Sequence, residues 1–185
     1  MDAFLTSTVT VAIAEIGDKT QLLSLLLAAR YHHKWSIIAG IFCATLLNHF
    51  ASAWFGQWIM TVIPAHIGTY IVAGCFILVG MWALFPDKLE DHGTSAVGKY
   101  GAFMAALILF FVAEIGDKTQ IATVVLGAQY NQVIAVTLGT TLGMMLANVP
   151  VVLLGERIMK VFPLSWARYA AAMIFITLGV LALIT

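Results

Sequence analysis

The residues best suited to chemistry in this sequence form one polar motif that occurs twice within apolar surroundings. Residues 14–21 read AEIGDKTQ, and residues 113–120 read the same. A charged side chain near the middle of a membrane helix is costly, at roughly 2.5–3.5 kcal/mol for Asp or Lys. Six such side chains therefore predict a functional site in which they face one another or water: Glu15, Asp18, Lys19, Glu114, Asp117 and Lys118.

The charge and donor atoms of this set favour a divalent cation as the ligand. Four carboxylates and two lysines leave two net negative charges, which one divalent cation or two protons would neutralise. Oxygen donors suit Mn²⁺, Ca²⁺ or Mg²⁺, whereas Cu(I) and Zn²⁺ prefer Cys and His. We expect the four acids to bind the metal. Side-chain oxygens that are candidates to complete the shell come from Thr20, Gln21, Thr119 and Gln120.

The elements that position the motifs are predicted to be membrane helices. Of the 185 residues, 62% are apolar and only 10% are charged, against about 25% charged in an average soluble domain. The mean hydropathy is +0.99. A formal net charge of zero without a basic stretch excludes a nucleic-acid-binding protein. The composition therefore predicts an all-α integral membrane protein, with residues 1–185 as a single transmembrane domain.

Six apolar stretches are long enough to cross a bilayer, which takes about 20 residues. Both motifs lie within such a stretch. Because positions i, i+3 and i+4 share a helix face, a continuous helix would project Glu15, Asp18 and Lys19 together, and likewise their counterparts. Gly17 and Gly116 would allow close helix packing or let the helix loosen. The expected spans are 3–29, 36–60, 66–86, 101–129, 133–156 and 164–184.

The two halves of the chain are copies of one another. Residues 4–86 (repeat one) align with 103–185 (repeat two) without a gap, and the matches include Tyr31 with Tyr130 and Pro64 with Pro163. Each copy holds three predicted spans, so the copies must cross the membrane in opposite directions. Inverted repeats with a site near the midplane are typical of secondary transporters. Duplication as a mere route to a larger bundle is less favoured, because the most similar segment is also the most polar.

The basic residues predict the orientation in the membrane. Seven of the nine Lys and Arg residues fall in connections on one side, and the opposite side has none. Under the positive-inside rule the basic side is cytoplasmic, so both termini are expected outside. The seven are Arg30, Lys34, Lys88, Lys99, Arg157, Lys160 and Arg168.

The paired motif is similar to that of a known family. Two E-x-G-D-[KR]-[TS] blocks, one opening each half of a six-span protein, resemble the small membrane cation transporters that include bacterial manganese exporters and Golgi manganese/calcium–proton exchangers, within the cation/calcium exchanger superfamily. The resemblance covers nearly the whole chain. It implies cation ligation by the motif acids, and it carries over to Glu15, Gly17, Asp18, Lys19 and Thr20, and to Glu114, Gly116, Asp117, Lys118 and Thr119.

Three further polar residues lie in apolar spans. Asn48 and His49 are in the second span, and Asn148, which aligns with His49, is in the fifth. They are candidates to contact the ion or its carboxylates, and interhelical hydrogen bonding is an equally good interpretation. A purely structural role for the charged motif residues, in which each lysine pairs with its neighbouring Asp, is disfavoured. Buried ion pairs rarely recover the free energy lost on desolvation.

The leading hypothesis is a secondary transporter in a bacterial inner membrane that exports Mn²⁺, or Ca²⁺, in exchange for protons. Its expected partners are the metal ion, protons and the bilayer. The metal is its substrate, and no cofactor or enzymatic activity is expected. A metal-binding or sensing subunit and a channel without proton exchange stay open as alternatives. An intramembrane hydrolase is weaker, because no activated nucleophile accompanies the acids. The sequence leaves open the choice between the two ions, the stoichiometry and the oligomeric state.

Overall fold

The computed structural model describes residues 3–85, 101–155 and 164–184, and all regular secondary structure in them is α-helical. This confirms the all-α class. The helices in chain order are α1 (Ala3–Ala14), α2 (Lys19–Arg30), α3 (Lys34–Val62), α4 (Ala65–Ala83), α5 (Ala102–Glu114), α6 (Lys118–Tyr130), α7 (Val133–Leu154) and α9 (Leu164–Ile184).

The first and fourth predicted spans are broken helices, which corrects the expectation of continuous ones. The chain leaves helical geometry between α1 and α2, and again between α5 and α6. Gly17 has φ +82° and Gly116 has φ +76°, a left-handed conformation that glycine adopts at no steric cost. Glu15 and Lys19 therefore do not share one helix face. Of the two roles expected for the glycines, the structure shows the second, in which the helix is interrupted at each glycine.

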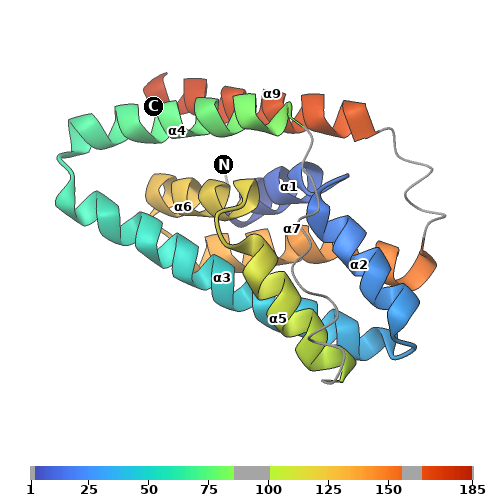
Figure 1. Cartoon of the computed structure of the whole chain (residues 1–185). Coiled ribbons are helices and arrows are strands. Elements are labelled where there is room, and N and C mark those ends of the chain that lie inside the picture. The colour runs from blue at the N-terminus through green and yellow to red at the C-terminus, as the bar shows by residue number, and fades with distance from the viewer. Residues whose placement is uncertain (1–2, 86–100, 156–163, 185) are drawn as a thin grey trace.

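The two long helices each pack against the broken helix of the other repeat. α3 lies along α5, and α7 lies along α1. A Cβ atom added at Gly40 would lie 2.5 Å from the carbonyl oxygen of Phe103, and one at Gly139 would lie 2.5 Å from that of Phe4. These glycines let the helix backbones touch. The repeats are thereby interlocked, and both breaks are brought to the middle of the bundle (Figure 1).

Helices α4 and α9, which are equivalent in the two repeats, form a pair along one edge of the bundle (Figure 1). The rings of Phe76 and Phe175 stack with centroids 6.5 Å apart. Gly80 faces the carbonyl oxygen of Ala172, and Gly179 faces that of Ala73. Because residue numbers rise along one helix as they fall along the other, α4 and α9 are antiparallel.

The α4–α9 pair contacts a different part of the broken helix in each repeat. α4 contacts α6, and α9 contacts α1. α2 and α5 instead lie against α7 and α3 and diverge from the pair (Figure 1). One face of the bundle is thus covered by the pair, and the equivalent face is not.

Four of the described helices are long and apolar enough to cross a membrane, namely Lys34–Val62, His66–Ala83, Val133–Leu154 and Trp166–Ile184. The apolar helices α1 and α5 are shorter. With 29 residues, α3 is about 44 Å long at 1.5 Å per residue, which exceeds the roughly 30 Å hydrocarbon core. Many large apolar side chains on the outer surface are exposed, as lipid contact requires, among them Trp54, Tyr70 and Met173.

Candidate functional site: a buried carboxylate cluster

The helix breaks bring three of the four motif acids together. Carboxylate oxygens of Glu15, Glu114 and Asp117 all lie within 4.8 Å of one another. Both glutamates are fully buried, and Asp117 is 2% exposed. Three carboxylates this close repel one another strongly unless positive charge, in the form of a cation or protons, lies among them.

Hydroxyl groups satisfy only part of this cluster. Thr20 donates a hydrogen bond to Oε2 of Glu15, and Thr119 donates one of 3.0 Å to Oδ2 of Asp117. Oε1 of Glu15 and both carboxylate oxygens of Glu114 accept no hydrogen bond from any described residue. A buried oxygen without a partner is costly. These three oxygens are therefore well suited to coordinate a metal ion.

The two motif lysines have different environments. Nζ of Lys19 lies 3.2 Å from Oδ1 of Asp117, so it pairs with the acid of the other repeat rather than with its sequence neighbour. Nζ of Lys118 donates a 2.9 Å hydrogen bond to the carbonyl oxygen of Phe85, just beyond α4, and lies 6.0 Å from the ring centroid of Trp82. Lys19 thus contributes charge to the carboxylate cluster, and Lys118 contacts the end of α4.

Asp18 lies outside the group of three. It is 5% exposed and occupies the residue before α2, as Asp117 does before α6. Together with Gly17, Lys118 and Arg168 it lines a small pocket of about 20 Å³. Of the four acids expected to bind the metal, the structure groups three, and Asp18 lines this pocket instead.

The motif glutamines hold the helix breaks. The amide N–H of Gly17 donates a 2.8 Å hydrogen bond to Oε1 of Gln21, and the N–H of Gly116 donates a 2.7 Å bond to Oε1 of Gln120. Nε2 of Gln21 also donates to the carbonyl oxygen of Ala147 on α7. A break exposes backbone groups that must find partners in an apolar interior. The amide oxygens proposed for the metal shell are engaged in this task.

Of the polar residues on α3 and α7, two form interhelical hydrogen bonds and one contacts the carboxylate cluster. Asn48 donates to the carbonyl oxygen of Phe111, and Asn148 accepts a 2.8 Å bond from the hydroxyl of Ser24. Both asparagines thus link helices. Nε2 of His49, which is fully buried, lies 3.5 Å from Oε2 of Glu114. At the aligned positions 49 and 148, therefore, one repeat contacts the carboxylate cluster and the other does not.

Ser24 is a further polar residue near the site, and it was not predicted from the sequence. It is fully buried on α2 and connects that helix to α7 through Asn148. Its aligned counterpart is Thr123, which is also buried and whose hydroxyl donates to the carbonyl oxygen of Thr119. A hydroxyl residue one turn beyond each motif threonine, in both copies, was the available signal.

An all-helical membrane bundle whose two broken helices place buried acids at their breaks is the architecture of an ion transporter. The family described as "Divalent cation/proton antiporter GDT1" matches residues 3–91 and 102–185. The chain belongs to this family, which confirms the resemblance drawn from the motifs. The family is one of transporters and not of enzymes, and the protein is an integral membrane protein.

Curated relatives carry related names. The "Putative manganese exporter" of Vibrio cholerae serotype O1 is 48% identical over 180 residues, covering 97% of this chain and 89% of that protein. "GDT1-like protein sll0615" of Synechocystis is 29% identical over 179 residues, covering 84% of each. "GDT1-like protein 3" of Oryza sativa subsp. indica is 29% identical, covering 77% of this chain and 59% of that protein. No solved structure matches the chain significantly.

Proposed function

We propose that this protein exports a divalent cation across a bacterial inner membrane in exchange for protons, through the carboxylate cluster of Glu15, Glu114 and Asp117. Mn²⁺ is the first candidate substrate, and Ca²⁺ is the second. The observation that carries the proposal is the convergence of three buried carboxylates from both repeats within 4.8 Å. Carboxylate donors suit these hard cations, and the 48%-identical relative is named for manganese.

The charge of the cluster supports exchange for protons. Three carboxylates carry three negative charges, and Lys19, paired with Asp117, supplies one positive charge. The net charge of two negatives is neutralised by one divalent cation or by two protons. The metal-bound cluster and the doubly protonated cluster therefore have the same net charge of zero. Neither state places an uncompensated charge in the membrane interior, where such a charge is costly.

The arrangement of the helices supports six crossings in two inverted repeats. The broken helices α1–α2 and α5–α6 each count as one crossing, and α3, α4, α7 and α9 supply four more. The antiparallel contact of the equivalent helices α4 and α9 is what a pseudo-twofold axis in the membrane plane requires. With the basic connections in the cytoplasm, both termini are outside.

Reconstituted protein tests this function. Proteoliposomes loaded with a metal-sensitive dye are given Mn²⁺, Ca²⁺ or Mg²⁺ outside, with the lumen either acidic or at the outer pH. We expect Mn²⁺ entry that is accelerated by the acidic lumen and accompanied by proton efflux. Metal flux indifferent to the proton gradient would favour a channel, and saturable binding without flux would favour a metal-binding subunit.

A further inference from the structure

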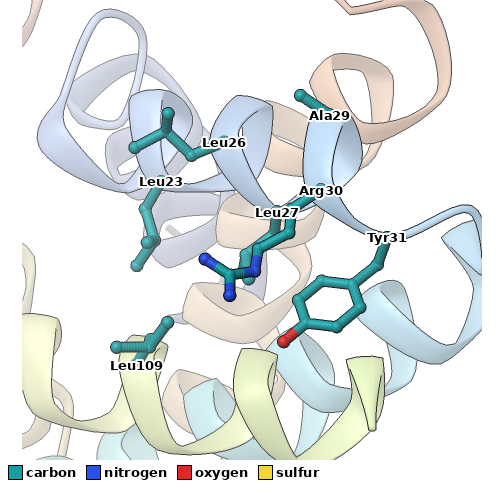
Figure 2. Close-up of a pocket in the computed structure, with 7 residues that line it drawn as sticks. All are labelled: Leu23, Leu26, Leu27, Ala29, Arg30, Tyr31 and Leu109. Carbon is teal, nitrogen blue, oxygen red and sulfur yellow. The ribbon is translucent and has the colours of Figure 1, made fainter. Parts of the chain in front are cut away.

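A groove lies between α2 and α5, and none of its lining residues belongs to the carboxylate cluster. Its volume is about 350 Å³. Figure 2 shows that the leucines of α2 and Leu109 of α5 form its walls, with Arg30 and Tyr31 at one end. The lining residues are Leu23, Leu26, Leu27, Ala29, Arg30, Tyr31 and Leu109.

In the described part of the second repeat, α4 and α9 cover the equivalent face. The counterparts of Leu23, Leu26 and Leu27 are Ala122, Val125 and Leu126, and all three are buried in the core cluster that contains α4 and α9 residues. In the first repeat, Leu26 is 51% exposed. The groove is therefore the face of the first repeat that the α4–α9 pair leaves uncovered.

Arg30 gives this apolar groove a charged end. It is the last residue of α2 and is exposed, and it forms no hydrogen bond or ion pair with any residue in the described part of the chain. In Figure 2 its guanidinium group points into the groove toward α5, and the Tyr31 hydroxyl points the same way. The counterpart of Arg30 in the second repeat is the uncharged Gln129. The positive charge is therefore present only in the repeat that carries the groove.

The lining decides against an entrance for the transported cation. A cation route needs polar or acidic groups to replace the hydration shell of the ion. Here the walls are leucine and alanine, and the single charge is a guanidinium that repels cations. A guanidinium instead prefers a phosphate, with which it forms bidentate hydrogen bonds.

The dimensions fit a lipid. Leu23 and Arg30 are seven residues apart on α2, or about 10 Å along the helix, which is roughly a third of the hydrocarbon core. An acyl chain that begins at Arg30 can therefore follow the leucines while its phosphate stays at the interface. Basic pockets between membrane helices bind anionic lipid headgroups in this way.

We propose that the groove between α2 and α5 binds an anionic phospholipid, with the phosphate on Arg30 and one acyl chain along Leu23, Leu27 and Leu109. This inference goes beyond the proposed transport function. The orientation proposed above would place this lipid in the cytoplasmic leaflet, and no other part of the inference depends on that orientation.

Native mass spectrometry of the full chain in neutral detergent tests the inference. The protein is titrated with phosphatidylglycerol and with phosphatidylcholine of the same acyl chains. We expect phosphatidylglycerol to be retained about fivefold better, which is the ratio expected for about 1 kcal/mol from one basic residue. Arg30→Gln installs the residue that the second repeat carries and should abolish this preference.

Two matched controls distinguish the groove from general effects. Lys34→Gln removes a nearby positive charge whose Nζ donates to the carbonyl oxygen of Leu153, outside the groove, and should keep the preference. Leu26→Trp fills the groove and should reduce retention of the lipid, whereas Leu47→Trp, at a 58% exposed position on α3, should not. Equal retention of the two lipids by the native protein, or equal losses in Arg30→Gln and Lys34→Gln, would overturn the proposal.

Discussion

Lys19 of the first repeat forms an ion pair with Asp117 of the second, with 3.2 Å between Nζ and Oδ1. The pair crosses the boundary between the two helix breaks and places one positive charge against three carboxylates. The lysine therefore sets the net charge of the cluster. It also couples the two halves at the position where the metal is proposed to bind.

Removing this charge should impair transport. Without Lys19 the cluster keeps one excess negative charge after a divalent cation has bound, so release of the metal is expected to be slow. Lys19→Gln should lower the maximal rate of Mn²⁺ transport by at least about tenfold, or roughly 1.4 kcal/mol in the barrier, while apparent affinity rises. Lys19→Arg, which keeps the charge, should retain more activity. Initial rates in proteoliposomes measure both, and an unchanged rate in Lys19→Gln would contradict the assignment.

The two glutamates should be equally indispensable. Glu15 and Glu114 both lie in the cluster and are fully buried, so Glu15→Gln or Glu114→Gln each removes one proposed ligand and one charge. We expect either substitution to abolish Mn²⁺ transport. Asp18→Asn should be milder than Asp117→Asn, because Asp18 lies outside the group of three. Mn²⁺ entry into proteoliposomes and direct Mn²⁺ binding to the purified variants provide the readouts, and equal effects at the two aspartates would show that the cluster contains a fourth ligand.

Mn²⁺ loading should weaken as the solution becomes more acidic. The carboxylates must be deprotonated to coordinate a metal, so protons compete for the same oxygens. Apparent affinity should be lower at about pH 6 than at about pH 8, and stability of the Mn²⁺ complex should follow the same sign. We propose that the two glutamates exchange the protons. This predicts that pH changes the residual Mn²⁺ binding affinity of the purified Glu→Gln variants less than that of Asp117→Asn. An affinity independent of pH would exclude competition.

The glycines at the breaks should be required because they adopt a positive φ, and not because a larger side chain would clash with its neighbours. No heavy atom lies within 4 Å of a Cβ added at Gly116, yet its φ is +76°. Gly116→Ala should therefore destabilise the protein by about 1–2 kcal/mol, and Gly116→Asn should cost less because Asn tolerates this region. Gly101→Ala, at a position with equal space and φ −57°, is the control. Thermal unfolding in detergent would detect the difference, and equal melting temperatures for the three variants would contradict it.

Much of this arrangement could be predicted from the sequence because it depends on composition and repetition. Apolar stretches free of charge predict membrane helices, and the duplicated AEIGDKTQ motif identified every carboxylate of the cluster. The helix breaks could not be predicted, since Gly17 and Gly116 also fit a continuous helix with close packing. Once a break rotates the chain, spacing no longer predicts which side chains meet. For this reason the separation of Asp18 from the cluster, and the contact of Lys118 with Phe85, required the structure.

The ratio of proton to metal flux tests the central claim most directly. Proteoliposomes carrying a pH dye and a Mn²⁺ dye would report both fluxes at once, with the membrane potential clamped at different values. An exchange of one divalent cation for two protons predicts two protons moved for each Mn²⁺ and a rate independent of the potential. Mn²⁺ entry without opposite proton movement, or a rate that follows the potential, would contradict the account.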